Sequence, residues 1–173
     1  MNLPWPTECP QFFTASIHNW LPLLHEDKYK NIITGSLQFL VQHKRIELNA
    51  FVIMNNHIHL IWQPLPRHAL KSIQLSFMKF TAQQLKFAYT DEKNSLIEQC
   101  RVNKADREYQ VWKRKPLSIE LCSESVFFQK LEYIHYNPVK AGLCDFPEEF
   151  YYSSALFYEK GIDHFNMLSH YLV

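Results

Sequence analysis

The sequence predicts an α+β fold in which helices cover one face of an antiparallel β-sheet. Segments with strand and helix periodicity alternate along the chain, and two apolar strands are joined by only two residues. In addition, the 173 residues contain no linker rich in Ser, Gly or Pro. With 47% hydrophobic residues the chain is long enough to bury a core, so we expect one domain over residues 1–173.

The first half of the chain predicts a strand, a helix and a hairpin. Residues 11–18 are rich in β-branched and aromatic residues and predict a strand, whereas residues 28–44 place apolar side chains at helical spacing. Residues 47–54 and 57–63 are apolar strands separated by Asn55-Asn56. Asn tolerates the positive φ that tight turns demand, so we expect these two strands to form a hairpin.

The next elements are a helix and a loop. Pro64 and Pro66 end the hairpin, and residues 69–89 predict a helix. Four apolar residues mark the buried side of this helix: Ile73, Phe77, Phe80 and Leu85. Residues 89–109 are polar and predict a loop.

The last part of the chain predicts a strand and a helix. Residues 111–120 would form the strand, with Pro116 at an edge position or a bulge, and residues 126–136 a helix that Pro138 ends. The resulting order, strand, helix, strand, strand, helix, strand, is that of a ferredoxin-like antiparallel sheet with helices on one face. The C-terminal tyrosine-bearing helix and the tail from residue 146 would be additions to it.

Composition excludes several classes of protein. Lys plus Arg is 18 against 17 for Asp plus Glu, so no global charge favours a nucleic-acid or membrane partner. Apolar runs fall far short of a membrane span, and the N-terminus lacks the design of a secretory signal, so we expect a cytoplasmic protein. The four cysteines form no C-x-x-C pair and predict free thiols: Cys9, Cys100, Cys122 and Cys144.

Two histidines are the first candidate for chemistry. His57 and His59 are two apart on a predicted strand, so their imidazoles project from the same face. Two imidazoles on one rigid face form the core of a divalent-metal site with open positions for substrate. The alternative is structural, with one histidine hydrogen-bonded in the core and the other exposed.

A tyrosine and an asparagine are the second candidate. Tyr133 and Asn137 are four apart on a predicted helix, so a phenol and an amide oxygen can approach the same ion. Asn137 precedes a proline, which biases it toward the end of the helix. The alternative is a helix in which Tyr133, Ile134 and Tyr136 only pack and Asn137 is a cap.

Three ordered blocks carry a family resemblance. They are NAFVIMNNHIHLI at residues 49–61, YIHYNPVKAGL at residues 133–143, and YYSSA at residues 151–155. Together they closely resemble the single-tyrosine HUH transposases of the insertion-sequence type, in the REP-associated tyrosine transposase branch. The resemblance runs from about residue 12 to residue 158, and the joint order of the blocks makes it specific.

The resemblance implies a ferredoxin-like fold and a set of functional residues. The family's histidine pair corresponds to His57 and His59, its nucleophile to Tyr133 and its polar third ligand to Asn137. This ligand set suits Mg²⁺ or Mn²⁺, and ligand type alone does not choose between them. Family members usually carry Pro where this chain has Asn55, a difference that alters a turn residue and not a ligand.

The implied activity is cleavage and rejoining of single-stranded or hairpin DNA through a 5′-phosphotyrosine with a free 3′-hydroxyl, in the cytoplasm at the nucleoid. A phenol is a weak nucleophile at neutral pH, so the metal ion would neutralise charge on the scissile phosphate. No general base stands out, because His135 lies on a different helix face from Tyr133. Relatives suggest both monomers and homodimers in which either subunit supplies the tyrosine helix.

DNA binding needs local positive charge, and two basic groups offer it. Residues 48–90 contain no Asp or Glu, and Lys71, Lys79 and Lys86 share one side of the predicted helix. The alternative for this stripe is an ordinary solvated face. The second group consists of Arg101, Lys104 and Arg107, followed by residues 113–115. Tyr109 and Trp112 lie among these basic residues and are expected to stack on bases. The candidate DNA-binding residues are Arg67, Lys71, Lys79, Lys86, Lys113, Arg114 and Lys115.

Three rival functions follow from the same residues. A histidine-triad nucleotide hydrolase is excluded, because the third alternating histidine it needs is Ile61 here. A metal-dependent phosphoesterase that uses water could share the histidine pair, but it would leave no DNA attached to the protein. A domesticated DNA-binding protein that no longer cuts is disfavoured, since all four proposed site positions hold competent residues.

Overall fold

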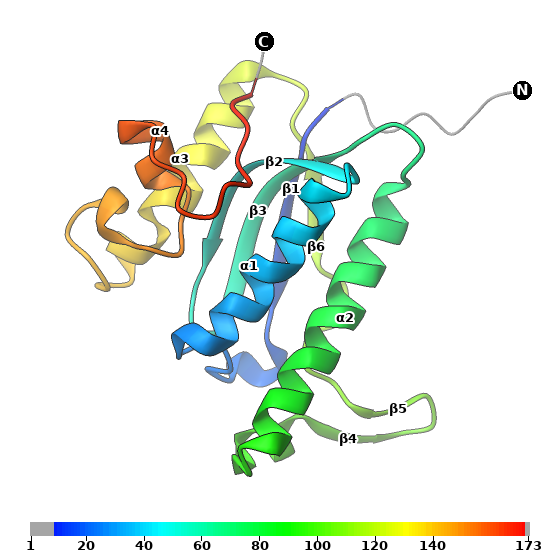
Figure 1. The fold of residues 1–173 in the computed structure, drawn as a ribbon. Coiled ribbons are helices and arrows are strands. Elements are labelled where there is room, and N and C mark those ends of the chain that lie inside the picture. The colour runs from blue at the N-terminus through cyan, green and yellow to red at the C-terminus, as the bar shows by residue number, and fades with distance from the viewer. Residues whose placement is uncertain (1–8, 172–173) are drawn as a thin grey trace, which may run out of the picture.

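The computed structural model describes residues 9–171 and contains a four-stranded antiparallel sheet (Figure 1). Its strands are β1 (Gln11–Ser16), β2 (Ile46–Ile53), β3 (His57–Pro64) and β6 (Leu117–Glu120), in the spatial order β2-β3-β1-β6. Helix α1 (Asp27–Gln42) joins β1 to β2, and helix α2 (Leu70–Asp91) follows β3. The predicted order of these strands and helices is confirmed.

The two faces of the sheet are covered by different helices. Alternate residues of β3, including Ile58, Leu60 and Trp62, are buried in a core with α1 and α2. Ile61 and its neighbours on the opposite face form a second core with helix α3 (Glu124–Lys140). His57 and His59 have the same parity as Ile61, so the strand period directs both imidazoles toward α3.

The β2–β3 hairpin forms where the sequence predicts it, but the physical reason differs. Neither turn asparagine has a positive φ. Instead, the carbonyl of Asn55 accepts a hydrogen bond from the Leu24 N–H, and that of Asn56 accepts one from the Ile17 N–H. The turn is therefore held by the segment that follows β1, which includes the short 3₁₀ helix η1 (His18–Trp20).

The predicted loop over residues 89–109 is wrong. The segment contains the 3₁₀ helix η2 (Ser95–Cys100) and a hairpin of β4 (Arg101–Lys104) and β5 (Arg107–Tyr109), which projects from the end of α2 (Figure 1). Its polar residues pair with one another, as the ion pairs of Arg101 with Glu98 and Glu108 show. The predicted strand over residues 111–120 shortens to β6, and Pro116 lies just before it.

Helix α3 does not end at Pro138 as predicted. Proline cannot donate the hydrogen bond that would continue the helix from its own nitrogen, yet α3 extends two residues further, to Lys140. The end is closed by hydrogen bonds from the Ala141 and Leu143 N–H groups to the carbonyls of Asn137 and Pro138, with Gly142 at a φ of +71°. Asn137 thus lies inside the helix and is not its cap.

The prediction of four free thiols is also wrong, because Cys9 and Cys122 form a disulfide with a Cα–Cα distance of 5.1 Å. The bond joins positions 113 residues apart, so their spacing in the sequence gave no indication of it. Pairing of β1 with β6, extended by the Leu121 N–H to the Pro10 carbonyl, brings the two positions together. Cys100 and Cys144 remain free.

The tail from residue 146 is an addition to the sheet, as expected. It contains the 3₁₀ helix η3 (Pro147–Glu149) and helix α4 (Ala155–Lys160). Between them the chain passes along the outer edge of β2, where the Ile53 N–H donates to the Tyr152 carbonyl and the Ser154 N–H to the Phe51 carbonyl. Across residues 9–171, no helix combines the length and apolar character needed to cross a membrane.

We expect the second core to hold α3 in place through Phe127, which is fully buried and stacks on Tyr171 at 4.3 Å between ring centroids. Phe127→Ala should lower the free energy of unfolding by about 3–5 kcal/mol, because it leaves a cavity between α3 and the sheet. The neighbouring Phe128 is exposed, so Phe128→Ala should cost much less. Urea titration followed by circular dichroism measures both, and equal losses would contradict this packing.

Candidate metal and tyrosine site

The histidine pair lies at the start of β3, on the face that α3 covers. The ring centroids of His57 and His59 are 4.9 Å apart, and His59 is buried. His59 also stacks on Phe12 of β1 at 5.6 Å. The predicted common face of the two imidazoles is therefore present.

Asn137 contacts both histidines from α3. Its Oδ1 lies 3.2 Å from His57 Nε2, and its Nδ2 lies 3.4 Å from His59 Nε2. One amide side chain thus joins the helix to two positions of the strand. The arrangement depends on Asn137 remaining inside the helix.

The other nitrogen of each imidazole also has a partner. His57 Nδ1 lies 2.7 Å from Asn56 Oδ1, and His59 Nδ1 lies 2.7 Å from Thr14 Oγ1 on β1. Such partners fix the orientation of a histidine ring in metal sites. They leave the two Nε2 atoms directed at the amide of Asn137.

Burial keeps both histidines in the neutral form that binds metals. Loss of solvent lowers the pKa of His57, and it lowers the pKa of His59 to about 3. The nearby charges of His57 and Lys130 add to the effect on His59. The lone pairs of the two imidazoles are therefore available at neutral pH.

Both ring nitrogens of His57 face amide groups, those of Asn56 and Asn137. A cation at Nε2 could replace the Asn137 contact and leave the Asn56 contact in place. Two imidazole nitrogens and one amide oxygen suit a divalent ion.

A carboxylate does not complete this group. Among the residues that the structure describes, no three His, Cys, Asp or Glu side chains gather into a group that could hold a metal. A metal ion held by the two histidines would therefore take the neutral amide of Asn137 as its third protein donor, with coordination positions left open.

Tyr133 lies beside the pair on the same face of α3 as Asn137. Its ring meets that of His59 edge to face at 5.2 Å between centroids, and the residue is 41% exposed. The ammonium groups of Lys130 and Lys140 lie 5.7 and 5.8 Å from the centre of the Tyr133 ring. An accessible phenol is thus next to the histidines and within reach of two positive charges.

His135 faces away from Tyr133, as the helical spacing predicts. Its Nε2 lies 2.9 Å from Ser154 Oγ, whose oxygen also accepts the Phe51 N–H. Burial lowers the pKa of His135 to about 4. This histidine joins α3 to the β2 edge, which is a structural role.

The predicted basic residues divide between two places. The Lys113 N–H donates to the Ser16 carbonyl, and Ser16 pairs with His57, so Lys113 lies at the edge of the histidine site. Lys86 lies 4.0 Å from the ring centre of Tyr109, at the β4–β5 hairpin. The others are exposed and are not brought to the histidines by a described contact: Arg67, Lys71, Lys79, Arg114 and Lys115.

The predicted stacking role of Trp112 is wrong. Trp112 is 6% exposed, and its Nε1 donates to Thr81 Oγ1 in the core between α2 and the sheet. Tyr109 is half-buried, with Lys86 and Arg101 over its ring and the Glu98 carboxylate at its hydroxyl, and its stacking on bases stays a prediction. Thr81 replaces Phe80 on the buried side of α2, which leaves Phe80 49% exposed.

Sequence reasoning missed an exposed aromatic residue at the site. Trp20 is 55% exposed, and its ring lies edge-on to His57 at 6.3 Å between centroids. Nothing in the sequence marks this position, because it follows the predicted first strand in an irregular segment.

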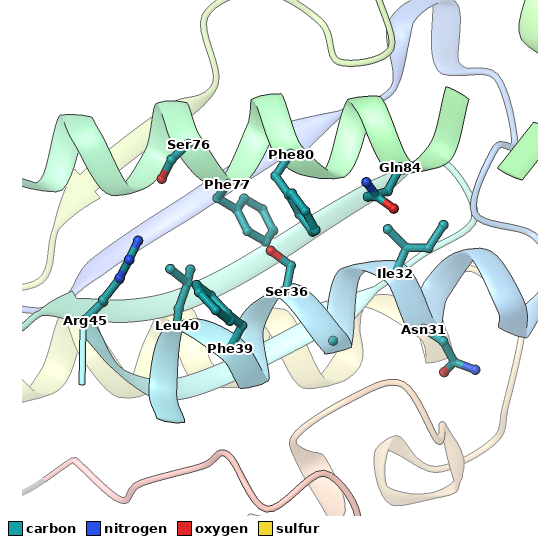
Figure 2. A pocket seen from close by; sticks show the side chains of 11 residues that line it. Asn31, Ile32, Ser36, Phe39, Leu40, Arg45, Ser76, Phe77, Phe80 and Gln84 are labelled. Atoms are coloured by element: carbon teal, nitrogen blue, oxygen red, sulfur yellow. The ribbon is translucent and has the colours of Figure 1, made fainter. Parts of the chain in front are cut away.

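A separate apolar groove lies away from the histidine and tyrosine cluster. It has a volume of about 530 Å³ and runs between α1 and α2, where Phe39, Leu40, Phe77 and Phe80 line it (Figure 2). Since α1 and α2 cover the face of the sheet opposite α3, the groove is separate from the histidine and tyrosine cluster.

Comparison with known proteins is consistent with this geometry. No protein-family model matches the chain. The chain is 26% identical over 130 residues to the "Putative REP-associated tyrosine transposase" of Haemophilus influenzae, an alignment that covers 73% of this chain and 68% of that protein. A solved REP-associated tyrosine transposase bound to a REP hairpin has a similar fold, with a TM-score of 0.65 and 15% identity over 100% of this chain and 98% of that one.

A second solved structure, a "putative transposase" from Deinococcus radiodurans, has a TM-score of 0.47 and 15% identity over 72% of this chain and 87% of its own. The similarity to the relative from Haemophilus influenzae agrees with the resemblance that the three sequence blocks carry. The similarity to the solved REP-associated tyrosine transposase shows a common fold.

Proposed function

We propose that this protein cleaves and rejoins single-stranded DNA through a covalent bond to Tyr133. The observation that carries the proposal is the position of an accessible phenol beside two neutral histidines, on the same helix face as Asn137. The arrangement of β-strands and helices supports a ferredoxin-like fold, as the family resemblance implies.

The chemical step is transfer of a phosphoryl group from DNA to the tyrosine. The Tyr133 oxygen attacks the phosphorus of the scissile phosphodiester, the phenol loses its proton, and the bond to the 3′-oxygen breaks. The products are a 5′-phosphotyrosine and a 3′-hydroxyl, which takes up a proton. Because the phosphotyrosine retains a phosphodiester bond, a second 3′-hydroxyl can reverse the step and join a new end.

The residues around Tyr133 would position the phosphate. We propose His57, His59 and Asn137 as the ligands of a divalent ion, Mg²⁺ or Mn²⁺, which supplies charge neutralisation at a non-bridging oxygen when bound. Lys130 and Lys140 add positive charge on either side of the phenol.

The proposed site residues come together within one chain. Tyr133 and Asn137 contact the histidines of their own chain, so we propose that the tyrosine helix acts on the DNA held by the same subunit. Hairpin or repeat DNA is the proposed substrate, on the basis of the solved relative that binds a REP hairpin. This substrate would place the protein at the nucleoid of the cytoplasm.

Two other functions would use the same residues. A phosphoesterase that activates water would have no need of an accessible phenol beside the histidines. A DNA-binding protein that no longer cuts would likewise have no need of that phenol. Covalent attachment of DNA to the protein distinguishes a transposase from both of these alternatives.

We expect Tyr133→Phe to abolish the covalent adduct, because it removes only the attacking hydroxyl. Incubation with single-stranded hairpin DNA and Mn²⁺, followed by a denaturing gel, measures the adduct. Tyr136 is also exposed on α3 and is the matched control, so Tyr136→Phe should retain it. Tyr151→Phe and Tyr152→Phe should behave like Tyr136→Phe. A cut strand without any adduct in the parent protein would favour the phosphoesterase.

We expect His57→Ala and His59→Ala each to weaken Mn²⁺ binding at least about tenfold, because each removes one proposed ligand. Isothermal titration calorimetry measures the affinity, and circular dichroism confirms the fold. His43 is exposed and distant in sequence from the site, so His43→Ala is the control and should bind Mn²⁺ like the parent. An unchanged affinity in the His57/His59 double variant would place the ion elsewhere.

We expect reversal of Lys71, Lys79 and Lys86 to Glu to weaken binding of single-stranded DNA irrespective of its sequence. Each lost phosphate contact should reduce the slope of log affinity against log salt by up to about 0.7. The measurement uses fluorescence anisotropy with Tyr133→Phe as the parent, so that cleavage does not disturb the equilibrium. Lys160→Glu at the end of α4 is the control, and an unchanged slope in the triple variant would make the stripe a solvated face.

A further inference from the structure

We propose that Trp20 is the stacking platform for a base of the single-stranded DNA next to the phosphate that the histidine and tyrosine site binds. The inference rests on the proposed function and adds a residue that positions the DNA strand at the site. Its ligand class is a nucleobase. The argument has three parts, which are the exposure of the indole, the way its backbone is held, and the charge beside it.

The indole is open to solvent beside the site. Trp62 and Trp112 are buried, whereas Trp20 is 55% exposed. The Trp20 ring approaches His57 with an interplanar angle of 79°, so the edge of one ring meets the face of the other. Because about half of the residue stays exposed beside this contact, part of the indole is available to a flat ligand.

The backbone at Trp20 is held in an uncommon conformation. Asn19 and Trp20 have φ angles of 53° and 56°, in the left-handed region, which Asn adopts more readily than a bulky aromatic residue does. Conformations of this kind persist where surrounding contacts enforce them. Here the Trp20 N–H donates to the Ile17 carbonyl at 3.0 Å.

Asn56 connects Trp20 to the histidine pair. Its Nδ2 donates to the Trp20 carbonyl at 3.3 Å, and its Oδ1 contacts His57 Nδ1 at 2.7 Å. A single amide therefore orients a proposed metal ligand and fixes the backbone of the exposed indole. Because Asn56 contacts both residues, the imidazole of His57 and the indole of Trp20 lie at a defined separation. A DNA strand that contacts both would require this.

The third part is the charge of Lys113, whose Nζ lies 5.5 Å from the centre of the Trp20 ring. A base stacked on the indole carries phosphates on both sides, and an ammonium group at this distance can pair with one of them. An aromatic face with an adjacent cation is the combination by which proteins hold single-stranded nucleic acid. Lys113 is also the predicted basic residue that the structure brings to the site.

The polar surroundings favour a base over an apolar protein partner. Trp20 borders on Asn19, His57 and Lys113, and a protein interface would instead need a wider apolar patch around it. A nucleobase needs only one flat face and a nearby positive charge. The strand would then run from Trp20 past His57 to Tyr133.

The first measurement compares DNA affinity among variants in the Tyr133→Phe background. The probe is a hairpin oligonucleotide with single-stranded flanks, chosen because the parent enzyme forms an adduct with it. Trp20→Ala should weaken binding about 5- to 100-fold by fluorescence anisotropy, whereas Trp20→Phe should retain most of the affinity. Phe146 is exposed outside the site, so Phe146→Ala should bind like the parent.

The second measurement locates the base. Each nucleotide of the flanks is replaced in turn by an abasic site, and we expect one replacement to weaken parent binding about as much as Trp20→Ala does. At that position the abasic site and Trp20→Ala together should weaken binding no more than either change alone.

Additive losses of affinity at every position, or full affinity of Trp20→Ala, would overturn the inference. If Trp20→Ala binds fully while the parent still forms the adduct, only Trp20 is excluded. A parent that binds no single-stranded DNA would overturn the proposed function as well.

Discussion

The contact of Asn137 with both histidines is the interaction on which the site depends. It joins α3 to β3 at the point where the strand presents its two imidazoles, and it sets Tyr133, one helical turn earlier, against His59. Buried polar groups are costly without partners, so this contact selects one position of the helix on the sheet. The apolar core around Phe127 supplies stability but does not determine which polar atoms meet.

Four parts of the chain meet in this polar cluster. Strand β1 provides Thr14, the hairpin turn provides Asn56, β3 provides the histidines, and α3 provides Asn137. Because each ring nitrogen of the pair faces a polar atom, neither imidazole can rotate without losing a contact. The histidines are therefore already oriented, which would reduce the cost of ordering them on binding a metal ion.

Much of this site could be predicted from local periodicity. The common face of His57 and His59 follows from the strand period of two, and the shared face of Tyr133 and Asn137 follows from the helix period. The rule for residues next to proline failed at Pro138, because the helix end is closed by hydrogen bonds further along the chain. There local hydrogen bonds at the helix end outweigh the preference of the residue before proline.

Other features depend on contacts between distant segments and could not be predicted. Cys9 and Cys122 meet because β1 pairs with β6, and Trp112 is buried in the core with α2, where Thr81 accepts its indole N–H. The exposure of Trp20 depends on left-handed backbone angles that Asn56 supports from the hairpin turn. Composition and spacing carry no information about such contacts.

The most direct test of the account is the position of Mn²⁺ in crystals of the protein. Anomalous diffraction should place one ion about 2.0–2.3 Å from the Nε2 atoms of His57 and His59, with the oxygen of Asn137 as the third protein ligand. An ion at that point would take the place of the contact between His57 Nε2 and Asn137 Oδ1. An ion bound elsewhere, with the Asn137 amide still between the two imidazoles, would contradict the account.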